Sequence, residues 1–207
     1  RPSQPLCGVF GYLRESKRVM PVLRICERLD TPLILAGEAD RDLERALARI
    51  GRRSAVHRLP FLDEQEWWIA AHSIDICINL RHPPAGETSG ITIRMMGIGK
   101  PVLLTDAEEI VGFPEAACLR VLSATAEESH LEAVLSWLLH SSSDRVEIGA
   151  RAARHIQQHH APERVGQPGV HPTKERPEAW APLRQLASPI DMLTSVLREA
   201  APGIGAV

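Results

Sequence analysis

The chain has 207 residues, a formal net charge of -2 at pH 7, 44% hydrophobic residues and 4% aromatic residues. This length suits one domain of ordinary size with an additional segment. The near-neutral charge gives no electrostatic reason to bind nucleic acid or an anionic membrane. Scarce aromatic rings also speak against a stacking platform for single strands. We therefore expect no nucleic acid partner.

The cysteines are typical of buried small hydrophobic side chains. They do not form a CxxC spacing, and so they favour neither a zinc site nor a disulfide framework. We expect a reducing, cytoplasmic compartment and no bound metal. No apolar run is long enough for a transmembrane helix and no signal peptide is visible. Because the chain starts at Arg1 and enters a predicted strand almost at once, we expect it to be cut from a longer protein. The four cysteines are Cys7, Cys26, Cys77 and Cys118.

Short apolar runs alternate with helical stretches along most of the chain. Continuous apolar runs are typical of strands buried on both faces of a parallel sheet. Such a strand–helix alternation predicts right-handed βαβ units. The predicted strands span residues 6–10, 32–37, 54–59, 74–80, 101–105 and 117–121. The predicted helices span residues 17–29, 40–50, 63–72, 90–98, 127–140 and 144–159.

This pattern predicts an α/β, doubly wound, Rossmann-like parallel sheet of about six strands, with helices on both faces. Ligands of such sheets bind at the carboxyl ends of the strands. We assign residues 1–165 to this domain. Residues 166–207 are predicted to form a Pro/Gly-rich linker followed by a helix over 189–200.

The loop after the fourth predicted strand reads Gly-Glu-Thr-Ser-Gly and opens a helix. Thr88, Ser89, Gly90 and Ile91 fall where the free amides and the dipole of a helix start create a site for an anion such as a diphosphate. Gly90 permits close approach of a ligand, and the two hydroxyls can donate hydrogen bonds. Glu87 is placed to accept hydrogen bonds from sugar hydroxyls.

The same turn is also compatible with simple helix capping, with Thr88 or Ser89 as the N-cap. Lys17 favours the anion site. It is predicted in the first turn of the helix that follows the first strand, capped by Ser16. A cation there opposes the helix dipole, and a bound anion would explain the arrangement.

The segment Glu87-Thr88-Ser89-Gly90, followed by Met95-Met96-Gly97-Ile98-Gly99-Lys100-Pro101-Val102, resembles the donor-binding domain of GT-B-fold glycosyltransferases. The similar class is the retaining, glycogen-synthase-like class, or glycosyl transferases group 1, whose donor-binding domain is C-terminal. The resemblance covers roughly residues 6–163. Further elements in the expected order are Gly11 with Lys17, the strand over 33–37 and the strand over 74–80.

The resemblance implies one half of a GT-B fold. The implied activity is a hexosyltransferase-like transfer from a nucleoside-diphosphate sugar to an unidentified acceptor, without metal or other cofactor. A second, N-terminal half would carry the acceptor and any peripheral membrane association, so we expect this chain alone to be incomplete. Lys17 would neutralise the departing diphosphate and Glu87 would orient the sugar, as catalytic residues. The implied donor-binding residues are Gly11, Thr88, Ser89, Gly90, Ile91 and Arg94.

Two positions depart from the class. In the class, a second glutamate near the middle of the helix after the loop holds the ribose. Counted back from Gly99-Lys100-Pro101-Val102, this position is Arg94; counted forward from Glu87, it is Met95. Tyr12 and Leu13 stand where an arginine is common. Arg94 is therefore open to another role, such as pairing with phosphate. The departures keep a second function open, a degenerate nucleotide-binding or protein-interaction module. A dinucleotide-dependent oxidoreductase is disfavoured, since residues 8–14 lack the three-glycine fingerprint.

Other residues fall near the same predicted edge. Leu59-Pro60-Phe61 follows a predicted strand and is placed to border a nucleobase. His82 follows the fourth strand and Asp106 follows the fifth, each with a plain loop role as the alternative. Of Trp67 and Trp68, one is expected to pack in the core.

Overall fold

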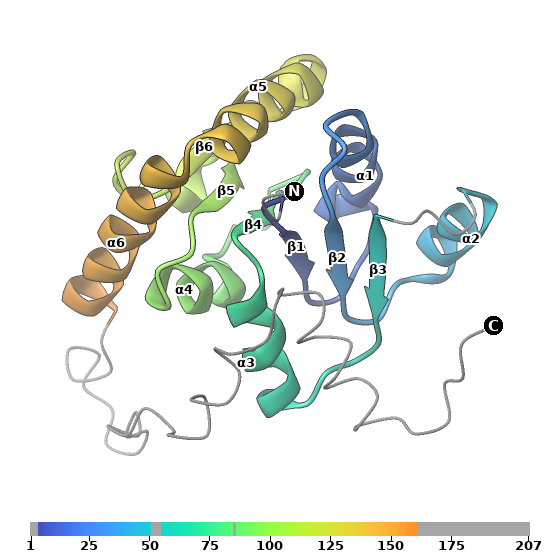
Figure 1. Ribbon diagram of the computed structural model, residues 1–207, viewed down its shortest axis with the longest axis horizontal. Helices are drawn as coiled ribbons and strands as arrows, with labels where there is room; N and C mark the ends of the chain where they lie inside the picture. Colours follow the sequence, from blue (N-terminus) through green and yellow to red (C-terminus); the bar gives the residue numbers. More distant parts are fainter. Residues whose placement is uncertain (1–3, 51–54, 85, 161–207) are drawn as a thin grey trace.

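The computed structural model describes residues 4–50, 55–84 and 86–160. These residues contain one six-stranded parallel sheet in the order β3-β2-β1-β4-β5-β6 (Figure 1). This order is that of a doubly wound Rossmann-type sheet, with its switch point between β1 and β4. The predicted fold class is confirmed. The strands are β1 (Cys7–Phe10), β2 (Leu33–Ala36), β3 (Val56–Leu59), β4 (Ile76–Asn79), β5 (Val102–Thr105) and β6 (Leu119–Val121).

Helices cover both faces of the sheet (Figure 1). One core lies under α1, α2 and α5, and the other lies under α3 and α4. The helices are α1 (Val19–Arg28), α2 (Arg41–Ile50), α3 (Glu64–Ser73), α4 (Gly90–Gly97), α5 (Glu127–His140) and α6 (Ser142–His159). Three 3-10 turns are η1 (Glu15–Lys17), η2 (Glu108–Ile110) and η3 (Ala124–Ala126).

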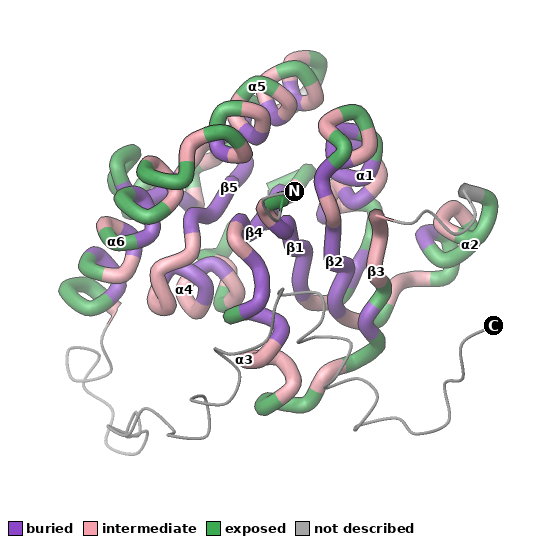
Figure 2. Tube along the Cα trace, viewed as in Figure 1, coloured by how far each residue is buried: buried purple, intermediate pink, exposed green. Residues whose placement is uncertain are grey.

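The central strands are apolar on both sides because each side meets a helix layer. In β1, Cys7 and Val9 belong to the core under α1, whereas Phe10 belongs to the core under α3 and α4. Figure 2 shows β1, β2, β4 and β5 as buried, whereas β3 at the edge is partly exposed and the helices alternate between buried and exposed residues. Double burial explains why these strands have continuous apolar runs instead of an alternating pattern.

Local capping fixes where some helices begin. The Asp63 carboxylate accepts the Glu66 amide at 2.8 Å, and the Glu66 carboxylate accepts the Asp63 amide at 2.9 Å. This reciprocal pair starts α3. The Ser141 hydroxyl accepts the Asp144 amide, so α6 begins at Ser142, earlier than predicted.

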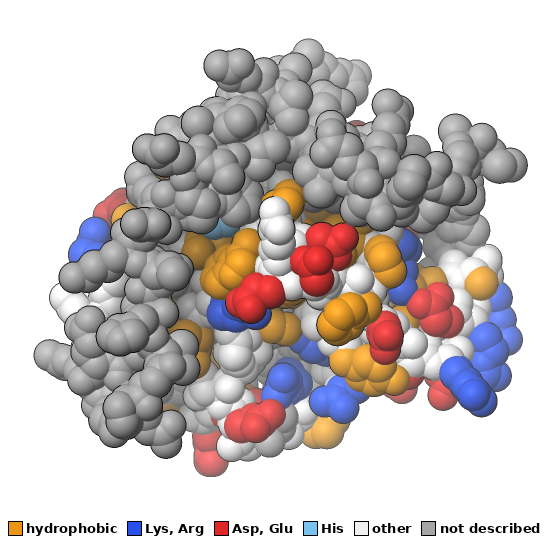
Figure 3. Space-filling model, turned by 90° about the horizontal axis from the view of Figure 1, so that it is seen from below, with side chains coloured by type: hydrophobic (Ala, Val, Ile, Leu, Met, Phe, Trp, Pro, Cys, Tyr) orange, Lys and Arg blue, Asp and Glu red, His pale blue; other side chains and the backbone are white. Residues whose placement is uncertain are grey.

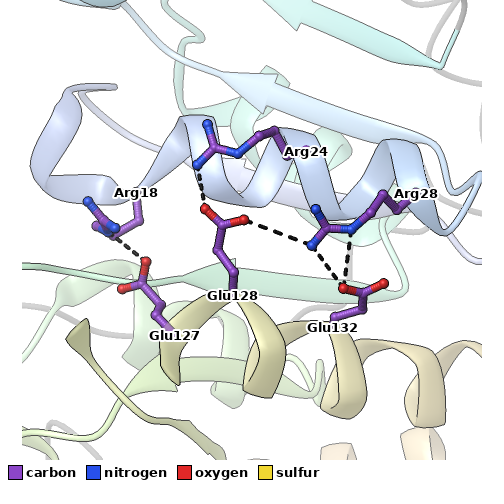
Figure 4. A network of polar contacts seen from close by, with 6 residues as sticks. All are labelled: Arg18, Arg24, Arg28, Glu127, Glu128 and Glu132. Carbon is purple, nitrogen blue, oxygen red and sulfur yellow. Dashed lines mark hydrogen bonds and ion pairs between the residues drawn. The ribbon is translucent and has the colours of Figure 1, made fainter. Parts of the chain in front are cut away.

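An arginine–glutamate network joins α1 to α5 on the outside of the sheet (Figure 4). The arginines follow one another along α1 in the same order as their glutamate partners along α5. The ion pairs are Arg18–Glu127 at 2.7 Å, Arg24–Glu128 at 2.5 Å and Arg28–Glu132 at 2.8 Å.

The predicted linker over 166–182 and the predicted helix over 189–200 lie outside the described residues. All four cysteines are buried and unpaired. None of the helices in the described ranges combines the length and apolar character that a membrane crossing requires.

Candidate functional site

Lys17 lies between the sheet and the start of α1. Its side chain is buried, at 5% exposure, and its Nζ donates to Phe10 O at 2.8 Å and to Asn79 Oδ1 at 3.2 Å. The predicted helix start was wrong here. Lys17 ends η1, and α1 begins after Arg18, whose left-handed backbone (φ 55°) interrupts the helix. Ser16 is therefore not the N-cap, and the interruption turns Lys17 back towards β1.

Asn79 connects Lys17 to α4. It is the last residue of β4, beside β1 in the sheet. Its Oδ1 accepts from Lys17 and its Nδ2 donates to Thr92 Oγ1 at 2.8 Å. Both Asn79 and Thr92 are buried, so the network holds the turn, the sheet and the helix in one arrangement. Sequence analysis missed Asn79, whose only signal was an amide ending an apolar strand.

A pocket of about 460 Å³ opens where these elements meet, and we call it the Lys17 pocket. It brings together six of the eight predicted site residues. Gly11 and Thr88 do not line it. The residues that do are Tyr12, Arg14, Lys17, Arg81, Glu87, Ser89, Gly90, Ile91 and Arg94.

The start of α4 forms one wall of the Lys17 pocket and is open to solvent. Ser89 is the N-cap, but its side chain makes no capping hydrogen bond. Gly90 is exposed, and a Cβ there would meet nothing within 4 Å. The amides of this first turn lack partners within the helix, as at any helix start, and a ligand can reach them. The Thr88 hydroxyl instead donates to Glu109 O at 3.4 Å.

Positive charge is concentrated in this pocket. Burial, Arg81 and Arg14 lower the pKa of Lys17 from 10.5 to about 8, with burial the largest cause. Glu87 Oε1 lies 4.0 Å from Arg81 Nη1, but the Glu87 side chain is 80% exposed. In Figure 3, acidic, basic and hydrophobic side chains are interspersed on the face shown. The positive charge at the pocket is therefore that of its own lining residues, Arg14, Lys17, Arg81 and Arg94, and not of a broad basic surface.

Arg94 is held at the edge of the pocket by aromatic rings. Its guanidinium lies 3.9 Å from the ring centroid of Trp67 and 4.4 Å from that of Trp68. Its Nη2 also pairs with Glu64 Oε1 at 3.1 Å. These contacts hold the Arg94 guanidinium in a defined orientation. As an arginine, residue 94 offers no carboxylate that could accept hydrogen bonds from a ribose.

A second, more apolar pocket of about 250 Å³ adjoins the first at Tyr12, and we call it the Trp67 pocket. Phe61, predicted to border a base, lines it. Gly11 also lies here, at φ 95°, where a Cβ would come within 2.7 Å of Ile91 Cδ1. The lining residues are Gly11, Tyr12, Ala36, Gly37, Glu38, Phe61, Leu62 and Trp67.

The remaining candidates have structural contacts. The His82 amide donates to Ser16 O at 2.8 Å, which ties the loop before α4 to η1. Asp106 pairs with Arg120 at 3.0 Å. Among the described residues, no three His, Cys, Asp or Glu side chains are grouped so as to hold a metal ion.

No protein-family model matches this chain. No curated protein matches it in sequence either. Solved structures match its fold. HepE from Anabaena, in complex with UDP and glucose, aligns with a TM-score of 0.62 and 18% identity over 75% of this chain and 44% of its own. Sucrose-phosphate synthase from Thermosynechococcus elongatus gives a TM-score of 0.65 and 15% identity over 76% and 42%.

A third structure is a single domain. It is the C-terminal domain of the group 1 glycosyl transferase LpcC from Francisella tularensis, with a TM-score of 0.62 and 18% identity over 77% of this chain and 87% of that domain. The chain thus has the fold of a GT-B C-terminal domain, as predicted. It spans less than half the length of the matched HepE and synthase chains, 44% and 42%.

Proposed function

We propose that the Lys17 pocket binds the diphosphate of a nucleoside-diphosphate sugar, and that the chain is the donor-binding half of a glycosyltransferase. The proposal rests on how positively charged side chains and free backbone amides are arranged around the pocket. Lys17, Arg14 and Arg81 face the open amides at the start of α4 across one pocket. A buried lysine with neutral partners, two nearby arginines and accessible amides together favour a compact anion.

The Trp67 pocket supports the rest of the donor. Its walls are mostly apolar and include Phe61, Leu62 and Trp67, which suits a flat base. It joins the Lys17 pocket at Tyr12, so a base and a diphosphate of one molecule can occupy the two. HepE, which shares the fold, has been solved with UDP and with UDP-glucose.

The chemical demand of the reaction fits these groups. Transfer breaks the bond between the anomeric carbon and a phosphate oxygen, while the acceptor's hydroxyl oxygen forms the new bond and its proton passes to the departing diphosphate. Negative charge grows on the departing diphosphate, where Lys17 and the amides of α4 stabilise it. Glu87 accepts hydrogen bonds from sugar hydroxyls and orients the ring. We infer that a second domain supplies the acceptor, since the matched enzymes are about twice as long.

Arg94 supports a second candidate, a nucleotide-binding module that does not transfer sugar. Its guanidinium is occupied by Trp67, Trp68 and Glu64, and its position offers ribose no carboxylate. Recognition of the sugar separates the two candidates, because the chain alone is expected to transfer poorly. Slow release of UDP from UDP-glucose that depends on Lys17, or tighter binding of UDP-glucose than of UDP that is lost in Glu87→Ala, supports the transferase. Equal binding of UDP and UDP-glucose, unchanged in Glu87→Ala, supports the module.

A second lysine, Lys100, which is partly buried, allows a matched test. Lys100 Nζ also donates to backbone carbonyls, those of His72 and Ile74, and burial also lowers its pKa, but it lies before β5 at the other end of the sheet. Calorimetric titration with UDP, GDP and their sugars should show weak binding, at micromolar to millimolar Kd. Lys17→Met should weaken it about tenfold or more, and Lys100→Met should leave it unchanged. Equal losses in both variants, with native circular dichroism, would refute the proposal.

A further inference from the structure

Arg81 is a cation of the Lys17 pocket that the sequence did not single out. It follows β4 by two residues, and its amide donates to Thr105 Oγ1 at 2.9 Å, at the end of β5. Its side chain is only 17% exposed. The ends of β4 and β5 therefore fix the backbone of Arg81. Its side chain lies at the boundary of two cavities. These are the Lys17 pocket and a cavity of about 20 Å³ beyond it.

Glu87 lines the same two cavities and is the carboxylate that the structure pairs with Arg81. The pair is loose. The closest atoms are 4.0 Å apart, and the Glu87 side chain projects largely into solvent. Exposed ion pairs of this kind contribute little, so a stronger anion readily replaces the carboxylate.

A diphosphate is such an anion. It carries more charge than one carboxylate, and a guanidinium can bind it through two parallel hydrogen bonds. Lys17 and the start of α4 already favour phosphate on this side of Arg81. Glu87 carries a single negative charge, and at 4.0 Å it makes no bidentate hydrogen bonds to Arg81 in this structure. Charge and geometry therefore both favour exchange.

We propose that Arg81 exchanges anions: it pairs with Glu87 until the donor's diphosphate takes its place, and the released carboxylate then binds the donor's sugar hydroxyls. The inference rests on the proposed function and adds to it a coupling between phosphate binding and sugar recognition. Glu87 thus competes with a nucleoside diphosphate that lacks a sugar, and assists one that carries a sugar.

Calorimetry on the full 207-residue chain tests the exchange with UDP and UDP-glucose. Glu87→Gln should bind UDP about two- to fivefold more tightly, because a weak competing ion pair is removed. Arg81→Gln should bind UDP about tenfold more weakly. In the double variant, the Glu87→Gln gain should disappear. The preference of the wild type for UDP-glucose over UDP should be lost in Glu87→Gln.

The ion pair Arg58–Glu44, on β3 and α2, provides the control, since Glu44→Gln also removes one exposed carboxylate paired with an arginine. It should leave both Kd values unchanged. Each of three results would overturn the exchange. The first is UDP binding by Glu87→Gln that is unchanged or weaker. The second is an equal gain in UDP affinity when Glu87→Gln is made in the Arg81→Gln background, and the third is wild-type UDP affinity in Arg81→Gln. A wild-type chain that binds no nucleotide overturns the proposed function itself, and the exchange with it.

Discussion

At Lys17, the fold places an ammonium group among neighbours that oppose its charge. Its hydrogen-bond partners, Phe10 O and Asn79 Oδ1, are neutral, while burial and nearby arginines lower its pKa to about 8. A bound diphosphate reverses this balance, because an adjacent anion favours the protonated form. Binding and protonation of Lys17 are therefore linked.

The linkage predicts opposite pH trends in two measurements. Between pH 8 and 10.5, the unfolded chain keeps a proton on Lys17 that the folded chain loses, so stability relative to Lys17→Met should rise with pH. Over the same window, UDP-glucose affinity should fall as Lys17 loses its charge. Calorimetry near pH 8 in buffers of different ionisation enthalpy should show proton uptake, absent in Lys17→Met. Proton release, or no uptake in the wild type, would contradict the assignment of Lys17 to the diphosphate.

Among the elements, α1 and α5 show how position decides the strength of an ion pair. All three arginine–glutamate pairs look alike in Figure 4, but the Glu127 side chain is 2% exposed and those of Glu128 and Glu132 are exposed. Arg18 also holds the left-handed turn that ends η1 and directs Lys17 to the sheet. The innermost pair therefore joins α5 to the candidate site.

Removing partners along this network should give graded losses of stability. Arg18→Ala should cost about 2 to 3 kcal/mol, because it leaves the buried carboxylate of Glu127 without its cation. Arg24→Ala and Arg28→Ala should each cost about 1 kcal/mol or less, as exposed pairs do. Urea unfolding at neutral pH measures all three. Similar losses in the three variants would show that burial of Glu127 does not distinguish the inner pair.

The same elements show what the sequence could predict. Apolar runs placed the strands within about two residues, because burial on both faces is a local pattern. They could not reveal the break at Arg18, since it depends on a left-handed backbone angle (φ 55°) that a residue other than glycine adopts only in a particular tertiary setting. The loop before α4 was recognisable from its glycines and hydroxyls. Asn79 and Arg81 were missed, because their roles depend on which strands lie side by side, and this is set by contacts far apart in sequence.

Across the whole molecule, α6 joins the two helix layers at the β6 edge of the sheet. Ile148 belongs to the core under α1 and α5, while Ala152 and Ile156 belong to the core under α3 and α4. This bridging is possible because α6 approaches the turn before β5 closely at Gly149. A Cβ at Gly149 would lie 1.9 Å from Gly99 O, a backbone atom that cannot simply rotate away.

Gly149→Ala sets two effects against each other. Alanine in a helix favours folding by about 1 kcal/mol relative to glycine. The new methyl group would overlap the Gly99 carbonyl, and moving α6 would disturb both cores, so we expect a net loss of about 2 kcal/mol or more. Gly97→Ala is the control. Its Cβ would meet Ile156 Cγ2 at 3.6 Å, an ordinary contact, so the propensity gain should prevail there. Thermal unfolding should therefore shift down for Gly149→Ala and stay level or rise for Gly97→Ala. A more stable Gly149→Ala would mean that α6 is free to move outward, and that the two layers do not depend on its close approach.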